Sequence, residues 1–140
     1  MGRITLSFII VFLISCAAQN TIIEFDRYNI EKEYYPNGLL MYESSYRYNK
    51  LDGISKSWSE DGNLTSKVEY KNGLIHGTWE TYYPSGKLKN RTLYIDGKKH
   101  GKEVWFHSNG QKQSEAYYTN DLLSSEIIRW NKNGVEITNY

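Results

Sequence analysis

Histidines and glutamates are the side chains in this sequence best suited to acid–base or metal chemistry. His76 and His100 each stand directly before a glycine, and His107 lies at the start of a predicted turn. A metal or acid–base site needs several such groups converging on one point, and the sequence has no cluster with metal-ligand spacing. We therefore predict that His76 and His100 shape loops and that His107 has no special role. Three glutamates are interpreted as solvated strand residues: Glu43, Glu69 and Glu115.

A search for sequence motifs of catalysis or cofactor binding also finds no functional site. The chain has no glycine-rich phosphate loop, no nucleophile elbow and no zinc-binding His-Glu motif. We therefore predict no catalytic residue, no cofactor and no metal, and we do not expect the protein to be an enzyme.

The sole cysteine, Cys16, is placed where a covalent modification is expected. It follows Arg3 and an apolar run over residues 4–14, which is too short for a transmembrane helix and typical of a signal-peptide core. The sequence LISC at residues 13–16 resembles the bacterial lipobox, in which the cysteine is acylated and becomes the first mature residue. We expect a lipoprotein signal peptide at residues 1–15 and lipidation of Cys16. The alternative is an ordinary secretory signal with an incidental cysteine.

Composition places the chain among folded proteins that carry little net charge. Aromatic residues make up 15% of its 140 residues, and they favour the half-buried surfaces of β-strands. Seventeen basic and 16 acidic side chains give a net charge of +1, so the basic footprint of a nucleic-acid-binding protein is absent. No nucleic-acid partner is expected.

Several residue types recur with a period of 24 residues, and a period of this length indicates a stacked repeat architecture. One glycine series is Gly38, Gly62, Gly86, Gly110 and Gly134. Four residues before each of these glycines stands an aromatic residue: Tyr34, Trp58, Tyr82, Phe106 and Trp130. A tyrosine series is Tyr46, Tyr70, Tyr94 and Tyr118. Two further series are Gly53, Gly77 and Gly101, which lapses at Ser125, and Asn49, Gly73, Gly97 and Asp121.

The last of these series indicates hairpin loops. Asn, Gly and Asp tolerate a positive φ, which tight hairpin turns require. The segments between the glycines alternate with period two, as in residues 63–70, and this predicts strands. We therefore predict an all-β fold, a single-layer antiparallel β-meander of tandem 24-residue hairpin repeats with glycine-bearing turns. In "YKNGLIHGTW", Gly73 is expected at the positive-φ corner, and Gly77 is expected where the backbone leaves the loop and passes close to its neighbour. Gly53 and Gly101, at the same place in their repeats, are likewise expected to be turn glycines.

The segments "KNGLIHGTWETYYPSG" and "DGKKHGKEVWFHSNG" resemble MORN-type repeats, in the bacterial variant found in proteins labelled YwqK-like antitoxins. The resemblance covers about residues 33–140, or about four and a half repeats. It leaves residues 16–32 as the lipidated N-terminus followed by a linker or first strand. Atypical terminal units, as at Ser125, are expected where a stacked array must be capped.

The aromatic residues allow two interpretations. Those in the repeat series are expected mainly to pair across strands and hold the sheet, although part of that stripe could bind a peptide, glycan or protein. Aromatic residues outside these series are not required for the packing of every repeat, so they are the better candidates for partner binding. They are Tyr35, Tyr42, Trp79, Tyr83, Trp105 and Tyr117.

Taken together, these features favour a lipid-anchored, non-enzymatic repeat protein of the bacterial cell envelope that binds another protein through an extended sheet. The acylated Cys16 would provide the membrane contact, and the identity of the protein partner stays open. One alternative, implied by the family label alone, is an antitoxin or immunity protein; an export signal argues against a cytosolic antitoxin. Another, implied by the MORN resemblance, is phospholipid binding, which the near-zero net charge weakens.

Overall fold

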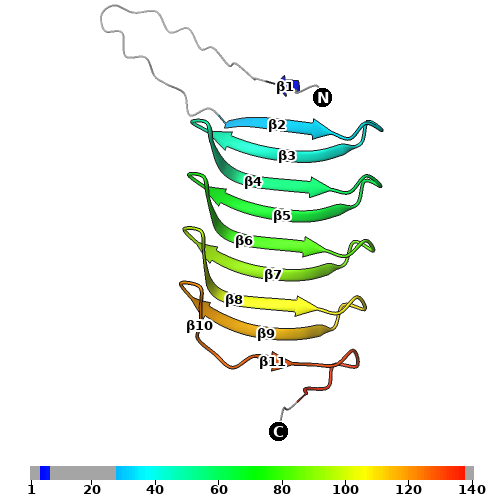
Figure 1. Cartoon of the computed structure of the whole chain (residues 1–140), viewed down its shortest axis with the longest axis vertical. Coiled ribbons are helices and arrows are strands. Elements are labelled where there is room, and N and C mark those ends of the chain that lie inside the picture. Colours follow the sequence, from blue (N-terminus) through cyan, green and yellow to red (C-terminus); the bar gives the residue numbers. More distant parts are fainter. Residues whose placement is uncertain (1–3, 7–27, 138–140) are drawn as a thin grey trace, which may run out of the picture.

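The structure is a computed structural model that describes residues 4–6 and 28–137, and these residues form one antiparallel sheet (Figure 1). In chain order the strands are β1 (Ile4–Leu6), β2 (Tyr28–Tyr34), β3 (Leu40–Arg47), β4 (Lys50–Trp58), β5 (Leu64–Lys71), β6 (Leu74–Tyr82), β7 (Leu88–Ile95), β8 (Lys98–Phe106), β9 (Lys112–Thr119), β10 (Leu122–Leu123) and β11 (Ile128–Arg129). Each strand from β1 to β9 pairs with the next, and β11 also pairs with β9. The predicted single-layer β-meander is confirmed.

Tight two-residue turns join the strands at one end of the stack, on the left in Figure 1. In the turn between β5 and β6, Asn72 has a φ of 52° and Gly73 a φ of 88°. Positive φ at both central residues gives the backbone twist that suits a two-residue hairpin. The prediction of positive φ is confirmed for the whole series, since the equivalent residues also have it: Asn49, Gly97 and Asp121.

Wider turns join the strands at the opposite end. In one of them the Gly86 N–H donates to the carbonyl oxygen of Tyr83 over 2.8 Å, and the Tyr83 N–H donates to that of Lys87 over 2.8 Å. Gly86 has a φ of 78°, so the residue that closes the turn occupies the left-handed region. The same pattern holds at Gly38, Gly62, Gly110 and Gly134.

The third glycine series lies elsewhere than expected. Gly53, Gly77 and Gly101 do not occupy turns; they lie inside β4, β6 and β8, with φ between 96° and 111°. Near each of them the strand carries extra residues relative to its partner, and the register shifts, as between Val68 and Tyr70 in the β5–β6 pairing. These are β-bulges, which bend a strand and increase its twist. His76 and His100 likewise belong to strands rather than loops.

Neighbouring repeats are tied together at the tight-turn end. The Gly73 N–H donates to the carbonyl oxygen of Leu51 over 2.7 Å, and the Gly97 N–H donates to that of Ile75 over 2.8 Å. The Asp121 N–H makes the same bond to Lys99 over 3.0 Å, so each of these three turns is bonded to the strand that begins one repeat earlier, β4, β6 or β8. The array is stabilised by contacts between adjacent units, as expected of stacked repeats.

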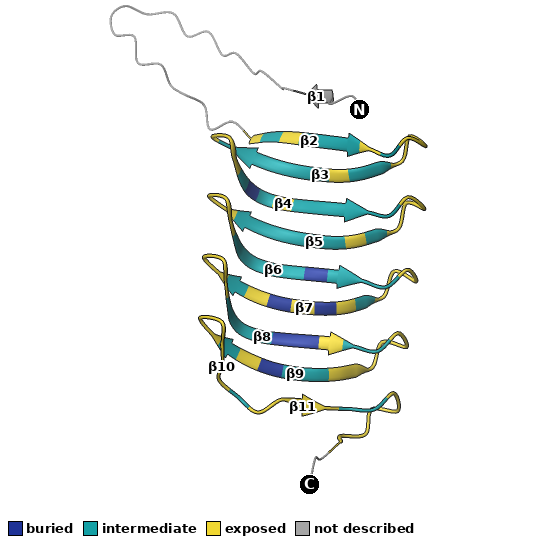
Figure 2. Ribbon diagram, viewed as in Figure 1, coloured by how far each residue is buried: buried dark blue, intermediate teal, exposed yellow. Residues whose placement is uncertain are grey.

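Very few side chains are fully buried in this single layer. Among the described hydrophobic residues only Val104 and Ala116 are buried, and buried residues gather on β7 and β8 (Figure 2). Most strand residues are half-buried, because one sheet with no covering layer leaves both of its faces in contact with solvent. A binding site formed by residues 28–137 is therefore a surface and not an enclosed cleft.

The two ends of the stack differ from its middle. Beyond β9 the repeat pattern lapses at Ser125, whose Oγ accepts a hydrogen bond from the Tyr117 N–H over 2.9 Å, and only the short strands β10 and β11 follow. At the other end β1 pairs with β2, although residues 4–6 belong to the predicted signal peptide. The rest of that peptide, with Cys16, lies outside the described residues.

Candidate functional site

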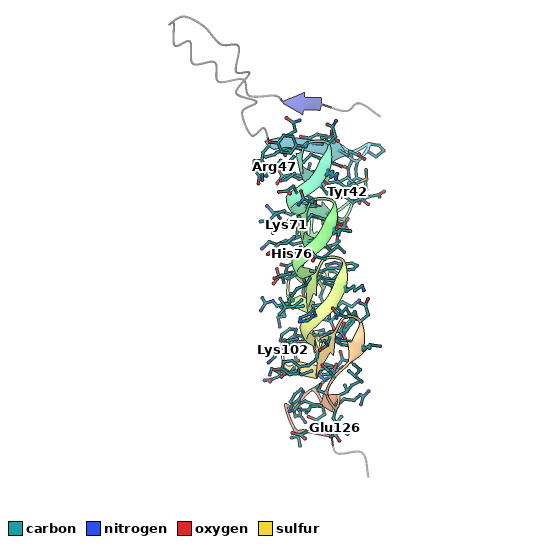
Figure 3. The ribbon with its side chains drawn as sticks, turned by 90° about the vertical axis from the view of Figure 1, so that its left-hand side faces the viewer. Tyr42, Arg47, Lys71, His76, Lys102 and Glu126 are labelled. Atoms are coloured by element: carbon teal, nitrogen blue, oxygen red, sulfur yellow. The ribbon has the colours of Figure 1, made fainter. Side chains whose placement is uncertain are left out.

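The register between strands sorts the side chains onto two chemically different faces. Residues directly opposite each other on neighbouring strands share a face. One face carries mainly aromatic and uncharged polar residues in a continuous cross-strand row that begins at a glutamate on β2, and we call it the hydroxyl face: Glu33, Tyr42, Ser57, Ser66, Thr81, Asn90, Trp105 and Ser114. The opposite face carries the next row, and we call it the charged face: Lys32, Glu43, Lys56, Lys67, Glu80, Arg91, Val104 and Glu115. In Figure 3, Tyr42 lies on one side of the ribbon and Lys102 on the other.

Three of the six candidate aromatic residues are exposed. Tyr42 and Trp105 lie in the same row of the hydroxyl face, with exposed fractions of 48% and 37%. Tyr117 is 43% exposed and lies on the charged face, where the Lys102 Nζ is 5.2 Å from the centroid of its ring. The structure therefore does not bring the exposed candidates together on one face.

Tyr35 and Tyr83 make contacts between repeats. The Tyr35 hydroxyl donates to the carbonyl oxygen of Trp58 over 2.8 Å, and the Tyr83 hydroxyl donates to that of Phe106 over 2.7 Å. His107 lies one repeat after Tyr83, and its Nε2 is 2.8 Å from the Trp130 carbonyl oxygen. The sequence did hold a signal for this role, because positions 35, 83 and 107 are separated by multiples of 24 residues.

Trp79 is half-buried and held by its neighbours. Its Nε1–H donates to the Ser66 Oγ over 3.0 Å, and its ring centroid is 5.9 Å from that of Tyr94. Tyr94 itself lies opposite Gly77, just as Tyr70 lies opposite Gly53. Tyr118 likewise lies opposite Gly101, so these three tyrosines lie across from glycines rather than from one another and cover the strand where it has no side chain. Tyr46, the first of the series, lies opposite Asn29 and Leu51 instead.

Each glutamate of the charged row contacts two cations. The Glu43 carboxylate is 3.0 Å from the Lys32 Nζ and 3.7 Å from the Lys56 Nζ. Glu115 is 2.9 Å from the Lys102 Nζ and 2.7 Å from the Lys112 Nζ. Hydrogen bonds from Lys112 and Lys102 hold the pKa of Glu115 below its usual value. The three acids of this row are thus partners in ion pairs; Glu43 and Glu115 are half-buried and Glu80 is buried. Glu69, also interpreted as a solvated strand residue, is half-buried and accepts a hydrogen bond from the Thr78 N–H over 3.3 Å.

Glu80 has the densest set of partners. Its carboxylate accepts hydrogen bonds from the Arg91 Nε over 2.8 Å and from the Tyr82 hydroxyl over 2.8 Å. Partial burial alone would raise the pKa of Glu80, but these hydrogen bonds and the charges of Arg91 and Lys67 outweigh burial and lower it. Burial and the same hydrogen bond raise the pKa of Tyr82 to about 12.

These carboxylates predict acid sensitivity. A carboxylate whose folded-state pKa lies below its unfolded value of 4.5 contributes stability above that value, and the contribution is lost as pH falls through the folded-state pKa. We expect the urea midpoint of the wild type to fall between pH 7 and pH 3, and to fall less in Glu80→Gln and Glu115→Gln. Glu60→Gln, at an exposed turn, is the control and should follow the wild type. Identical pH profiles for all four proteins would contradict the role of these ion pairs.

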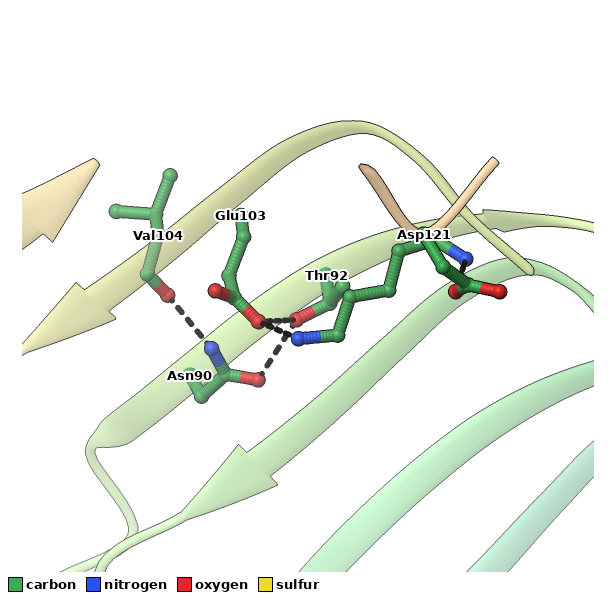
Figure 4. Close-up of polar contacts among 6 residues, drawn as sticks. Asn90, Thr92, Glu103, Val104 and Asp121 are labelled. Carbon is green, nitrogen blue, oxygen red and sulfur yellow. Dashed lines mark hydrogen bonds and ion pairs between the residues drawn. The ribbon is translucent and has the colours of Figure 1, made fainter. Parts of the chain in front are cut away.

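A buried polar network crosses β7 and β8 (Figure 4). The Lys99 Nζ is 2.6 Å from the Glu103 carboxylate, and the Thr92 hydroxyl lies 3.2 Å from the same oxygen. The Asn90 amide donates to the Val104 carbonyl oxygen over 3.1 Å. Burial lowers the pKa of Lys99, but its hydrogen bond to Glu103 and the charge of that residue outweigh burial and raise it. Because its donors and acceptors are paired with one another, this network holds the sheet together.

An open cavity of about 470 Å³ lies on the charged face near the first tight turns. Its buried carboxylate, Asp52, accepts hydrogen bonds from the Tyr28 hydroxyl over 3.3 Å and from the Asn72 N–H over 3.0 Å. Arg47 lies over the Tyr28 ring, and the His76 Nδ1 contacts Asp96 at 3.1 Å. The polar groups around this cavity thus support the turns.

Neither a metal site nor a membrane-spanning helix is found in the part of the chain that the structure describes. Among residues 4–6 and 28–137, no three His, Cys, Asp or Glu side chains are placed to hold a metal ion. Within the same residues, no helix is long and apolar enough to cross a membrane.

Comparison with known proteins identifies the repeat. Residues 27–48, 51–72, 75–96 and 99–120 each match the MORN repeat variant. The first matched segment begins at residue 27, whereas we predicted that the repeats begin at about residue 33. The first repeat therefore includes the whole of β2. No curated protein matches the chain. Since the four matched segments cover more than half of the sequence and coincide with the stacked hairpins, the chain belongs to the MORN repeat variant family.

Proposed function

We propose that this protein is a non-enzymatic scaffold of the bacterial cell envelope, held at a membrane by a lipid on Cys16, and that its sheet binds another protein. The observation that carries the proposal is the open architecture of the array. Both faces of the sheet meet solvent, and exposed aromatic residues stand on each of them, Tyr42 and Trp105 on one and Tyr117 on the other. Exposed aromatic side chains are frequent anchors in protein interfaces.

Site-specific photo-crosslinking in intact cells tests the binding proposal. A photoreactive phenylalanine analogue is placed singly at Tyr42, Trp105 or Tyr117, and at Trp79 as a half-buried control. We expect a discrete adduct of higher mass from at least one exposed position and none from the control, and the position identifies the binding face. If no position yields an adduct, the scaffold function is wrong. If the adduct contains a toxin, the antitoxin alternative replaces the general scaffold.

Lipidation is tested independently of binding. Cys16→Ala is expected to abolish metabolic labelling by a palmitate analogue and to move the protein out of the membrane fraction, because stable anchoring requires more than one acyl chain or other membrane signal. Ser15→Ala is the matched control, since it keeps the cysteine and a small neighbour, and it should label as the wild type does. A wild-type protein that takes up no label would exclude the lipid anchor.

A further inference from the structure

Two lysines face each other at the centre of the charged face. Lys56 on β4 and Lys67 on β5 are directly opposite in the register of the sheet. Like charges at directly opposite positions destabilise a pair of strands. The opposition of the two lysines is therefore unfavourable for the fold, although each also contacts a glutamate, and an anionic group placed between the two ammonium groups would relieve the repulsion.

The neighbouring glutamates compensate these lysines only weakly. Glu43 is 3.0 Å from Lys32 but 3.7 Å from Lys56. Glu80 is 2.7 Å from Arg91 but 4.0 Å from Lys67. Each carboxylate is thus drawn toward the cation on its far side, away from the lysine pair. The charges of Lys56 and Lys67 are therefore only partly neutralised by these two carboxylates.

The other directly opposed cations of the array are arranged differently. Arg47 lies opposite Lys50 at the first tight turn, but its guanidinium is 5.5 Å from the centroid of the Tyr28 ring and 5.6 Å from that of Tyr48. Those aromatic faces stabilise the charge of Arg47. Lys56 and Lys67 contact no aromatic ring in this way among the described residues.

Apolar residues border the lysine pair along the strands. Trp58, two residues beyond Lys56, lies opposite Leu64. On the other side is Ile54, which is 40% exposed and lies opposite Glu69, a carboxylate that is engaged by the Thr78 N–H at 3.3 Å. A ligand that fits here carries an anionic group with apolar groups beside it, as an acidic stretch of polypeptide does.

We propose that Lys56 and Lys67 form a docking point for a carboxylate of an acidic, extended segment of a partner protein. The inference rests on the proposed function, because it names the chemistry of the partner that the scaffold binds. The flanking carboxylates favour a narrow segment over a membrane. Glu43 and Glu80 each lie one strand away from the pair, about 5 Å, so a continuous anionic surface would meet them together with the lysines.

Binding to a defined acidic polymer tests the site. The full chain carrying Cys16→Ala, so that acylation adds no membrane affinity, is titrated into a fluorescein-labelled random copolymer of glutamate and tyrosine, followed by anisotropy. Lys56→Gln/Lys67→Gln is compared with the charge-matched control Lys98→Gln/Lys132→Gln, whose lysines stand outside the charged row. Loss of two charge contacts should weaken binding about tenfold in the first variant, and the control should bind as the wild type does.

Three further measurements separate the possible outcomes. The urea midpoint of Lys56→Gln/Lys67→Gln should equal or exceed that of the wild type, because a repulsion has been removed; a lower midpoint would indicate a structural role and overturn the proposal. Equal binding by all three proteins would also overturn it, as would stronger binding to phosphatidylglycerol vesicles than to the copolymer. In cells, a photo-crosslink placed at Ile54 should be lost in the double lysine variant. An adduct unaffected by that variant refutes the docking point and leaves the scaffold function standing, whereas no adduct at any exposed position refutes the scaffold itself.

Discussion

Replacing Gly77 with valine is expected to lower the free energy of unfolding by at least about 1–3 kcal/mol, the range of backbone strain alone. Gly77 has a φ of 111°, which side-chain-bearing residues rarely adopt. A Cβ at this position would also overlap the carboxylate of Glu69 and lie 3.1 Å from the Cβ of Glu69. Asparagine at position 77 should be nearly as damaging, because it meets the same contacts. The measurement is the urea midpoint of each variant.

Gly73 is the matched control for this prediction. Its φ is 88°, and the nearest atom to an added Cβ is the Cβ of Lys50 at 3.9 Å. Asn49 occupies the equivalent position of an earlier repeat with a φ of 59°. Gly73→Asn should therefore change the midpoint little, and Gly73→Val should lower it more, because β-branched residues are outliers at positive φ. The bulge interpretation fails if asparagine has the same effect at positions 73 and 77.

Deletion of one whole repeat, residues 63–86, is expected to leave a folded and shorter sheet. The deletion joins Gly62 to Lys87, so the wide turn keeps its pattern of residues. Trp58 then meets Leu88 in place of Leu64, and these two leucines have the same relation to their turns. Circular dichroism should show a β spectrum with a cooperative thermal transition, because each unit contacts mainly its neighbours.

Deletion of half a repeat, residues 63–74, should abolish folding. It joins Gly62 to Ile75, so β6 takes the place of β5 and each later turn falls at the wrong end of the stack. The bulge at Gly77 would then face a strand that lacks the matching irregularity, and a slip of register moves side chains to the wrong face. If both deletions give the same spectrum and the same melting behaviour, the array is not built from interchangeable 24-residue units.

Much of the fold could be predicted because repetition multiplies a weak local signal. A single Asn-Gly pair such as Asn72 and Gly73 only suggests a hairpin, but the same position holds a turn-forming residue in every unit. The alternation of side-chain type with period two between the turns then predicts where the strands lie. The sheet edges and the faces follow from the meander topology, since short turns join each strand to its neighbour.

The cross-strand partners could not be predicted, because they depend on the bulges. An extra residue changes which side chains face each other, and nothing in the sequence near Gly77 specifies how many residues the bulge holds. The opposition of Lys56 and Lys67 is therefore visible only in the structure. The contacts of Tyr35 and Tyr83 were also missed, because their hydroxyls reach carbonyl groups of the next repeat.

The direction of the strands has a mechanical consequence. The strands lie across the long axis of the stack, with β1 at one end and β11 at the other, so the hydrogen bonds between strands lie nearly parallel to that axis (Figure 1). Tension applied between the ends would load these bonds lengthwise and peel the hairpins away one after another, instead of shearing many bonds at once. Stretched between an anchor and a bound partner, such an array would extend stepwise at low force.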